Sequence, residues 1–225
     1  MAFIIVDPGS THMGKLDYAL QHITHAAYAG ASLIKFQLFK NPPNYAGGNI
    51  ELPIEWWPKL KERADECKIE LTASVFDEDM LDFLIAQKPK YIKFSYSKKG
   101  EVAWIEKALN AGIIPIVSCD VMTDHLVPDG CIKLYCIPEY PVRYRVSFDD
   151  LFPRFDGFSS HTMGIEQDLR AIKESGAQYL EKHSKLDGQT GKDCPDASFA
   201  VDYSDIARIS HFSKWALAFD PLSTT

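Results

Sequence analysis

The stretch Ala26-Ala27-Tyr28-Ala29-Gly30-Ala31-Ser32-Leu33-Ile34-Lys35-Phe36 joins the end of one predicted helix to one predicted strand. The apolar residues that lead into it have the i, i+3, i+4, i+7 spacing of one helix face: Leu16, Ala19, Leu20, Ile23 and Ala27. Gly30 stands where this helix should stop, because glycine readily adopts the positive φ of a residue just past a helix end. The short apolar run Leu33–Phe36 then predicts a strand. A helix, a glycine turn and a strand therefore form the basic unit of the chain.

The same unit recurs along the sequence. Eight strands are predicted, at Phe3–Val6, Leu33–Phe36, Glu70–Ser74, Tyr91–Phe94, Ile114–Ser118, Ile132–Tyr135, Asp156–Phe158 and Tyr179–Lys182. Amphipathic segments separate them, and strands joined by helices pair in parallel through right-handed crossovers. Eight such units in 225 residues predict an α/β protein with a compact (β/α)8 TIM barrel, slightly shorter than the typical ~250 residues.

An open, doubly wound sheet is the alternative fold. It would need a glycine-rich phosphate turn after the first strand, and Asp7-Pro8-Gly9-Ser10 does not match GxGxxG. The segment Cys119–Gly130 is short and polar for the helix expected there. Because no linker or shift in composition divides the chain, residues 1–225 are predicted to form a single domain.

Composition excludes several classes of protein. Lys and Arg number 24 against 31 Asp and Glu, and this net charge of −7 argues against a nucleic-acid partner. No apolar run approaches the ~20 residues that span a bilayer. The five cysteines are an odd number without a CxxC pair, and the first residues lack the basic start of a secretory signal. These features predict a cytoplasmic protein with reduced thiols and no membrane partner.

Two lysines lie inside apolar strands, Lys35 in Leu33–Phe36 and Lys93 in Tyr91–Phe94. A buried ammonium is costly unless it meets an anion. One possibility is that each lysine pairs with a neighbouring barrel carboxylate such as Glu181. The other is an anionic substrate whose carboxylate or phosphate lies across the barrel mouth, with hydroxyl donors from the ends of other strands, Ser74, Ser118 and Ser159.

His161 and His183 lie at the ends of two adjacent predicted strands. A single strand histidine is more often a hydrogen-bonded core residue than a ligand. Two imidazoles that converge with carboxylate or water oxygens fit an open site for Mn²⁺, Fe²⁺ or Zn²⁺. The pair therefore favours a divalent metal beside the predicted anion site.

Six fragments, in order along the chain, resemble the signatures of one family. They are Ile4–Gly14 ("AEIGxNHNG"), Ala31–Gln37 ("GADAVKFQ"), Ala73–Asp77 ("STPFD"), Leu134–Pro141 ("LHCxSxYP"), Gly157–Gly164 ("GYSDHTxG") and Glu181–Asp187 ("IEKHFTLD"). Each fragment is weak alone, but each falls at a predicted strand end. The sequence thus resembles the barrel domain of the sialic acid synthases, the N-acetylneuraminate synthase family.

This resemblance implies a TIM barrel that condenses phosphoenolpyruvate with an N-acetylated, N-acetylmannosamine-like amino sugar. The product would be a nonulosonic acid, with release of phosphate, and the cofactor a divalent metal, Mn²⁺ or Mg²⁺. The residues that the resemblance implies for phosphoenolpyruvate are Lys35, Ser74, Lys93, Ser118 and Ser159, with Ser95 on the strand face of Lys93. Those implied for the metal, the sugar and the reacting water are His161, His183, Gln37, Tyr140, Phe76, Asp7 and Asp196.

The sequence departs from the family pattern around the sugar. Tyr96 and Lys98 replace a serine and a glutamate after the fourth strand, so they leave the activity open. The small carboxyl-terminal antifreeze-like domain of the family has no counterpart here, so a homodimer or a separate chain is expected to supply a lid. The alternatives are a relative with a different carbonyl acceptor, and a non-catalytic protein that binds a phosphorylated metabolite or a partner.

Overall fold

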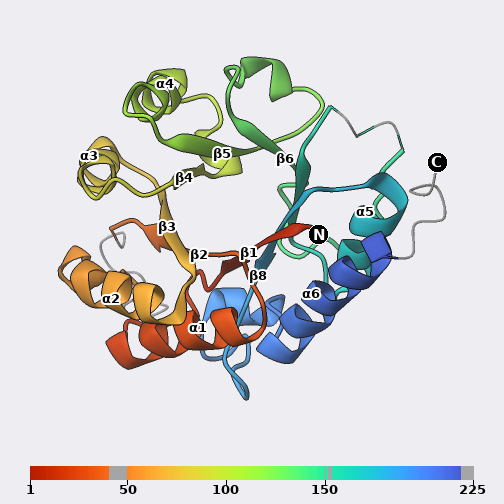
Figure 1. The fold of residues 1–225 in the computed structure, drawn as a ribbon, viewed down its shortest axis with the longest axis horizontal. Coiled ribbons are helices and arrows are strands. Elements are labelled where there is room, and N and C mark those ends of the chain that lie inside the picture. Colours follow the sequence, from red (N-terminus) through yellow and green to blue (C-terminus); the bar gives the residue numbers. More distant parts are fainter. Residues whose placement is uncertain (41–49, 150, 152–153, 219–225) are drawn as a thin grey trace.

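Eight parallel strands close into a barrel in the computed structural model, which describes residues 1–40, 50–149, 151 and 154–218 (Figure 1). The strands follow one another around the barrel in sequence order, and β1 pairs with both β2 and β8. Their bounds are β1 Phe3–Asp7, β2 Leu33–Leu38, β3 Glu70–Val75, β4 Tyr91–Phe94, β5 Ile114–Cys119, β6 Ile132–Cys136, β7 Gly157–Ser160 and β8 Tyr179–His183. The predicted TIM barrel is confirmed, and the open sheet is excluded.

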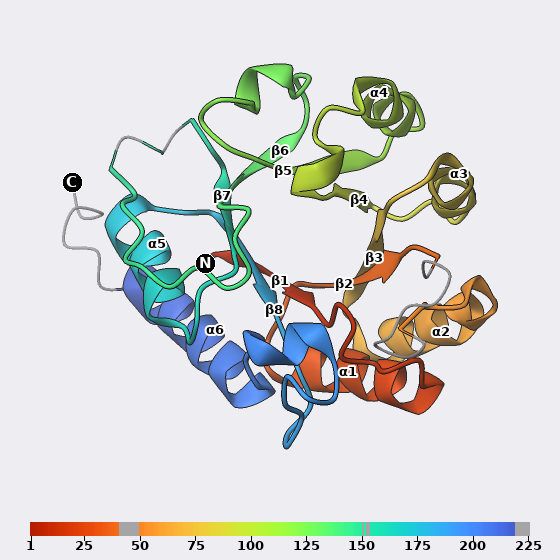
Figure 2. The same ribbon diagram turned by 180° about the vertical axis from the view of Figure 1, so that it is seen from behind.

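Helices surround the barrel on its outside (Figures 1 and 2). The α-helices are α1 Leu16–Tyr28, α2 Trp57–Cys67, α3 Glu78–Ala86, α4 Val102–Asn110, α5 Glu166–Ser175 and α6 Tyr203–Ala218. Short 3-10 turns are η1 Ile54–Trp56, η2 Tyr96–Lys98, η3 Asp124–Leu126 and η4 Pro195–Ser198. Gly30 follows α1 with φ +80°, as predicted.

The helix layer is incomplete beside β5 and β6. Between these strands the chain makes only the η3 turn, so the short, polar segment Cys119–Gly130 does not form the α-helix that the repeating unit would place there. Between β6 and β7 the described residues form no α-helix either. Strand β7 also begins one residue later than predicted, and Asp156, just before it, accepts a hydrogen bond from the Lys133 amide through its carboxylate at 2.7 Å.

The inner face of the barrel changes from apolar to polar along the strands. Near the amino ends, the apolar layer of the interior consists of Ile5, Leu33, Tyr91, Ile116 and Leu134. Two residues further along the same strands stand Asp7, Lys35, Lys93, Ser118 and Cys136, which line a cavity. Because side chains alternate between the two faces of a strand, both layers face the interior. The apolar layer closes one end of the barrel, and the polar layer opens at the other.

The strand register sets which polar residues meet. Asp7 on β1 pairs with His183 on β8, and Glu181 on β8 pairs with Ser159 on β7. On the other side of the barrel, Gln37 on β2 pairs with Ser74 on β3, which pairs with Lys93 on β4. Parallel strands thus bring residues from distant parts of the sequence to one end. None of the helices in the described part of the chain has the length and apolar character needed to cross a membrane.

Candidate active site

One cavity of about 380 Å³ lies at the carboxyl ends of the strands. All thirteen predicted site residues line it: Asp7, Lys35, Gln37, Ser74, Phe76, Lys93, Ser95, Ser118, Tyr140, Ser159, His161, His183 and Asp196. The further lining residues are Tyr96, Ser97, Cys136, Pro138 and Glu181. The structure therefore brings the predicted residues together at the mouth of the barrel, where TIM-barrel active sites lie.

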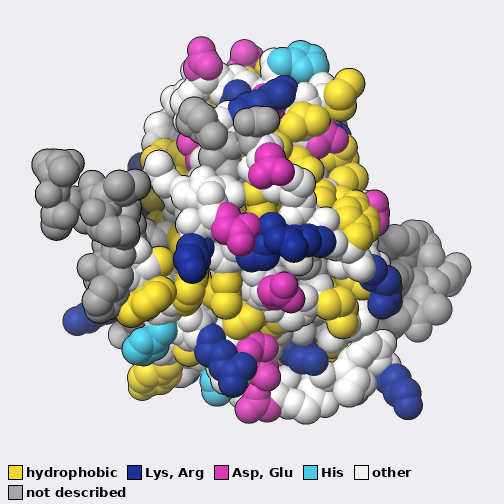
Figure 3. Space-filling view, turned by 90° about the vertical axis from the view of Figure 1, so that its right-hand side faces the viewer, with side chains coloured by type: hydrophobic (Ala, Val, Ile, Leu, Met, Phe, Trp, Pro, Cys, Tyr) yellow, Lys and Arg dark blue, Asp and Glu magenta, His cyan; other side chains and the backbone are white. Residues whose placement is uncertain are grey.

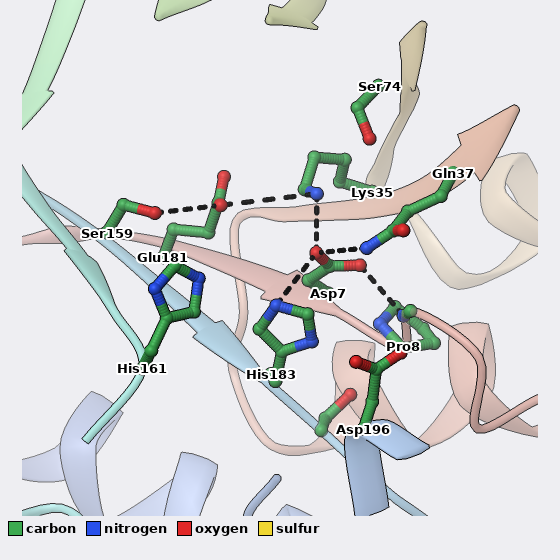
Figure 4. Close-up of polar contacts among 12 residues, drawn as sticks. Asp7, Pro8, Lys35, Gln37, Ser74, Ser159, His161, Glu181, His183 and Asp196 are labelled. Carbon is green, nitrogen blue, oxygen red and sulfur yellow. Dashed lines mark hydrogen bonds and ion pairs between the residues drawn. The ribbon is translucent and has the colours of Figure 1, made fainter. Parts of the chain in front are cut away.

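Two lysines and two carboxylates form the floor of this cavity, and all four side chains are buried. Figure 4 shows three of them, Lys35, Asp7 and Glu181. Lys35 Nζ lies 2.5 Å from Asp7 Oδ2 and 4.0 Å from Glu181 Oε1. Lys93 Nζ lies 3.7 Å from the same Glu181 oxygen. The possibility that barrel carboxylates pair with both lysines is thus realised, and Glu181 is shared between them.

These pairs shift the ionisation of the floor. Burial would raise the pKa of Asp7, but Lys35 and His183 lower it below its usual value. Burial would lower the pKa of Lys35, but Asp7 and Glu181 raise it. For Lys93, burial outweighs Glu181 and the pKa is lowered. Lys93 is therefore the less well neutralised ammonium, and an added anion would stabilise its charged form.

Hydroxyl groups lie beside Lys93 and beside Glu181. Lys93 donates to Ser118 Oγ at 2.8 Å and to the Phe94 carbonyl at 3.0 Å. Ser159 donates to Glu181 Oε1 at 3.1 Å, while Glu181 Oε2 is buried without a hydrogen-bond partner among the described residues. The floor thus combines two cations with hydroxyl donors, which is the donor set that phosphate oxygens accept.

The two predicted metal ligands face each other at the β7–β8 side of the mouth. The ring centres of His161 and His183 lie 5.5 Å apart. Nδ1 of His161 donates to the Ile137 carbonyl at 3.2 Å, which leaves Nε2 with a free lone pair. Burial lowers the pKa of His161 to about 3, so its imidazole is neutral, as metal ligation requires. Nδ1 of His183 is buried and accepts no hydrogen bond from any described residue.

A divalent ion fits this pair as an open site. Two imidazoles that bind one ion through nitrogens at ~2.1 Å have ring centres at most about 6.5 Å apart. The described residues contain no group of three or more His, Cys, Asp or Glu side chains close enough to hold a metal. His161 and His183 would therefore share the ion with substrate or water oxygens, as open metal sites do.

The loop after β1 binds the last predicted site residue, Asp196 of η4. Asp196 Oδ2 accepts hydrogen bonds from the amide and the hydroxyl of Ser10, both at 2.6 Å. The Gly9 amide donates to Asp7 Oδ1 at 2.8 Å. Gly9 has φ +54°, and a Cβ there would lie 2.4 Å from Asp196 Oδ2 and 3.1 Å from His183 Nδ1. Only glycine lets the backbone pass this close to both side chains.

The rim of the cavity is mostly aromatic and apolar. Tyr140 is 58% exposed, and its ring centre lies 4.1 Å from that of His161. Tyr96 donates through its hydroxyl to Asp120 Oδ2 at 2.6 Å, so its ring is held at the wall. Lys98 does not line the cavity: its ammonium lies 4.9 Å from the Trp104 ring centre and 3.7 Å from Glu101 Oε1. Tyr96 therefore lies at the cavity wall, whereas the Lys98 ammonium lies outside the cavity lining.

Glu181 is the functional candidate that the sequence did not single out as a site residue. The sequence named it as a possible partner for the lysines and placed it on the strand face of His183. A signal was present, because Glu181 lies two residues before His183 and therefore on the same strand face. Cys136 and Pro138, which belong to the family-like fragment Leu134–Pro141, and Ser97 also line the cavity, although none of the three was named as a site residue.

The fold and the site define a class: a parallel β/α barrel with buried lysines, hydroxyls and two imidazoles at its mouth. The sequence profile of the NeuB family matches residues 45–216. This chain belongs to the NeuB family.

Named relatives agree with this membership. The chain is 28% identical over 229 residues to the N,N'-diacetyllegionaminic acid synthase of Legionella pneumophila, covering 82% of this chain and 64% of that protein. It is 27% identical over 225 residues to the human N-acetylneuraminate-9-phosphate synthase, covering 82% of this chain and 62% of that protein. The chain thus spans less than two thirds of the length of these relatives.

A solved structure shares the fold. The N-acetylneuraminic acid synthetase of Leptospira borgpetersenii, solved in complex with citrate, superposes with a TM-score of 0.82 at 24% identity. The superposition covers 100% of this chain and 87% of that one. At this identity the likeness supports the barrel architecture.

Proposed function

We propose that this protein condenses phosphoenolpyruvate with an uncharged N-acetylated amino sugar to give a nonulosonic acid and inorganic phosphate. The observation that carries the proposal is the buried floor of Lys35 and Lys93 with its serine hydroxyls, beside the imidazoles of His161 and His183. The names of the relatives support the class of product, since they are synthases of legionaminic and neuraminic acids.

Phosphoenolpyruvate would bind over the floor. Its phosphate and carboxylate would take hydrogen bonds from the two ammonium groups and from Ser118, in place of part of the present pairing with Glu181. Charge-assisted hydrogen bonds of this kind are the strong ones. Because the donors are held by packing before the substrate arrives, they can stabilise the charge that grows on the departing phosphate.

The residues at the β7–β8 side would serve the carbonyl of the sugar. His161 and His183 would hold Mn²⁺ or Mg²⁺, which when bound supplies Lewis-acid polarisation of the aldehyde. C3 of the enol phosphate bonds to the aldehyde carbon, water adds at C2, and the C2–O bond to phosphate then breaks. Asp7 is ionised and lies 3.4 Å from the His183 ring nitrogen, so its carboxylate can orient the water, and the proton that this water releases passes to the aldehyde oxygen.

The rim favours an uncharged acceptor. Within the described residues, Lys35 and Lys93 are the only Lys or Arg side chains that line the cavity, and the proposed enolpyruvyl ester uses both. The outer wall consists of Phe76, Tyr96, Pro138 and Tyr140, which suit the methyl groups of acetamido substituents better than a second phosphate. The second candidate function is the same condensation with a different carbonyl acceptor. It is favoured by Tyr96, whose ring lies at this wall where the family pattern has a serine.

A phosphate-release assay tests the proposal. The purified protein is mixed with phosphoenolpyruvate, Mn²⁺ and, in turn, N-acetylmannosamine, its 6-phosphate, a diacetamido hexose and simple aldoses. We expect phosphate release with an uncharged acetamido sugar and little with the 6-phosphate. Release with an aldose that lacks an acetamido group would favour the second candidate. Phosphoenolpyruvate binding without release from any acceptor would contradict catalysis and indicate a binding protein.

A further inference from the structure

Strand β8 carries a buried ammonium that points away from the cavity. Glu181 and His183 face the mouth, and Lys182 between them faces the outer layer of the barrel, where it is 1% exposed. Its Nζ lies 3.0 Å from Oδ2 of Asp168, which belongs to α5 and is 0% exposed. Asp168 accepts no hydrogen bond of good geometry from the described residues, so this attraction is ionic.

The Lys182–Asp168 pair is buried, whereas another ion pair of α5 lies at the surface. On the side of the molecule that carries α5, Lys and Arg side chains lie next to Asp and Glu side chains at the surface (Figure 3). Arg170 and Glu174, also on α5, form such a pair at 2.9 Å, and Glu174 is half exposed. Exposed pairs of this kind contribute little and need no further account. The Lys182–Asp168 pair lies inside.

Lys182 also binds both neighbours of His161. Its Nζ donates to the Thr162 carbonyl at 2.7 Å, and it lies 3.3 Å from Ser160 Oγ and 3.4 Å from Thr162 Oγ1. The two hydroxyls are themselves hydrogen-bonded at 3.0 Å. One ammonium group, on the residue of β8 that precedes His183, therefore contacts α5 and the two residues on either side of His161 at the end of β7.

Stability alone does not account for the pair. Taking two charges out of water is costly, and replacing a buried ion pair by apolar residues of similar size is often neutral or stabilising. The pair does fix positions. Lys182 Nζ makes four contacts, to Asp168, Ser160 and Thr162, and these hold the backbone around His161 in place relative to β8. The two imidazole rings, 5.5 Å apart, sit on the segments that it joins.

We propose that Lys182 and Asp168 are positioning residues that hold His161 at the distance from His183 that a shared metal ion requires. This inference rests on the metal site of the proposed function. Neither side chain touches the cavity, so their effect reaches the site through the backbone of residues 160–162. Partners of this kind, one layer behind the ligands, typically change metal affinity about 10- to 100-fold when they are lost.

The test uses the double variant Lys182→Met/Asp168→Leu, which removes both charges together and leaves no orphaned ion. The matched control is Lys107→Met/Asp82→Leu, the same change at an exposed pair between α3 and α4. Mn²⁺ affinity is measured by electron paramagnetic resonance of the free ion, and Co²⁺ spectra report the ligand geometry. We expect the double variant to fold with an unchanged or higher melting temperature, to bind Mn²⁺ about 10- to 100-fold more weakly and to change the Co²⁺ spectrum. The control should match the wild type.

Wild-type Mn²⁺ affinity and an unaltered Co²⁺ spectrum in the folded double variant would overturn the proposal. If the wild type itself binds neither ion, the metal site of the proposed function fails, and the positioning role is decided by a crystal structure of the double variant. A displaced His161 ring would then support the role of Lys182. A ring in the wild-type position would refute it.

Discussion

Replacing Lys93 by methionine separates its two roles, the pairing with Glu181 and the binding of substrate. The ammonium is 2% exposed, and the substitution removes its hydrogen bonds to Ser118 and to the Phe94 carbonyl. It also removes the ion pair to Glu181 at 3.7 Å. Among the described residues, Glu181 then keeps Lys35 at 4.0 Å and the Ser159 hydroxyl at 3.1 Å.

The cost in stability follows from that uncompensated carboxylate. Breaking a buried ion pair by removing one partner costs about 3–5 kcal/mol. Burial lowers the pKa of Lys93, so its removal also relieves a desolvation penalty, and we expect the low end, about 3 kcal/mol. Adding Glu181→Gln removes the orphaned charge, so the double variant should recover about 2 kcal/mol of that loss.

Substrate binding should respond differently from stability. A charge-assisted hydrogen bond to phosphate contributes about 1.5–3 kcal/mol, so Lys93→Met should weaken phosphoenolpyruvate binding at least tenfold. The double variant should regain stability in urea unfolding but not affinity in titration calorimetry. Wild-type affinity in a stable double variant would refute the reasoning, because Lys93 would then serve only to neutralise Glu181.

Three further substitutions test other parts of the site and its support. His161→Gln should reduce Mn²⁺ binding at least about 100-fold with an unchanged unfolding midpoint, and full Mn²⁺ occupancy would exclude it as a ligand. Gly9→Ala should lower the free energy of unfolding in urea by about 1–2 kcal/mol and reduce phosphate release, because the alanine Cβ would lie 2.4 Å from an Asp196 oxygen. Unchanged phosphate release would show that the loop can shift to accept the side chain. Burial lowers the pKa of His22 to about 3, so the folded protein keeps this imidazole neutral while the unfolded chain protonates it below pH ~6.5. The contribution of His22 to the free energy of unfolding is therefore complete above that pH and is lost as the pH falls. His22→Gln should therefore reduce the difference in unfolding free energy between pH 7 and pH 5 by about 2 kcal/mol. If the variant and the wild type show the same difference, a group other than His22 causes it.

Local patterns were enough to predict the barrel. Most strands are short apolar runs, and each strand other than β1, β6 and β7 follows an amphipathic helix that can cover its outer face. The crossover rule then leaves few ways to arrange eight parallel strands. The strand ends were less certain, and β2 continues two residues past its predicted end to Leu38. Pairing with β3 extends it there, and a pairing partner is not visible in the strand's own sequence.

The site could be predicted where its residues obey strand periodicity. Lys35 and Lys93 stood out because an ammonium in an apolar strand needs a partner, and the two imidazoles because they end adjacent strands. Contacts made by loops could not be predicted in this way. The direction of the Lys98 side chain depends on Trp104 and Glu101 of the following segment, and no rule of spacing places it outside the cavity.

The amino-acid order by itself determined which residues share the barrel mouth, because alternation along each strand and the common direction of parallel strands follow from local geometry. Only the tertiary structure decided how the charges are distributed there. Whether Lys35 meets Asp7 or a ligand, and whether Glu181 serves one lysine or two, depends on distances of a few ångströms across the closed barrel. Those distances are set by register and packing between segments far apart in sequence, to which Coulomb attraction in a buried site is acutely sensitive.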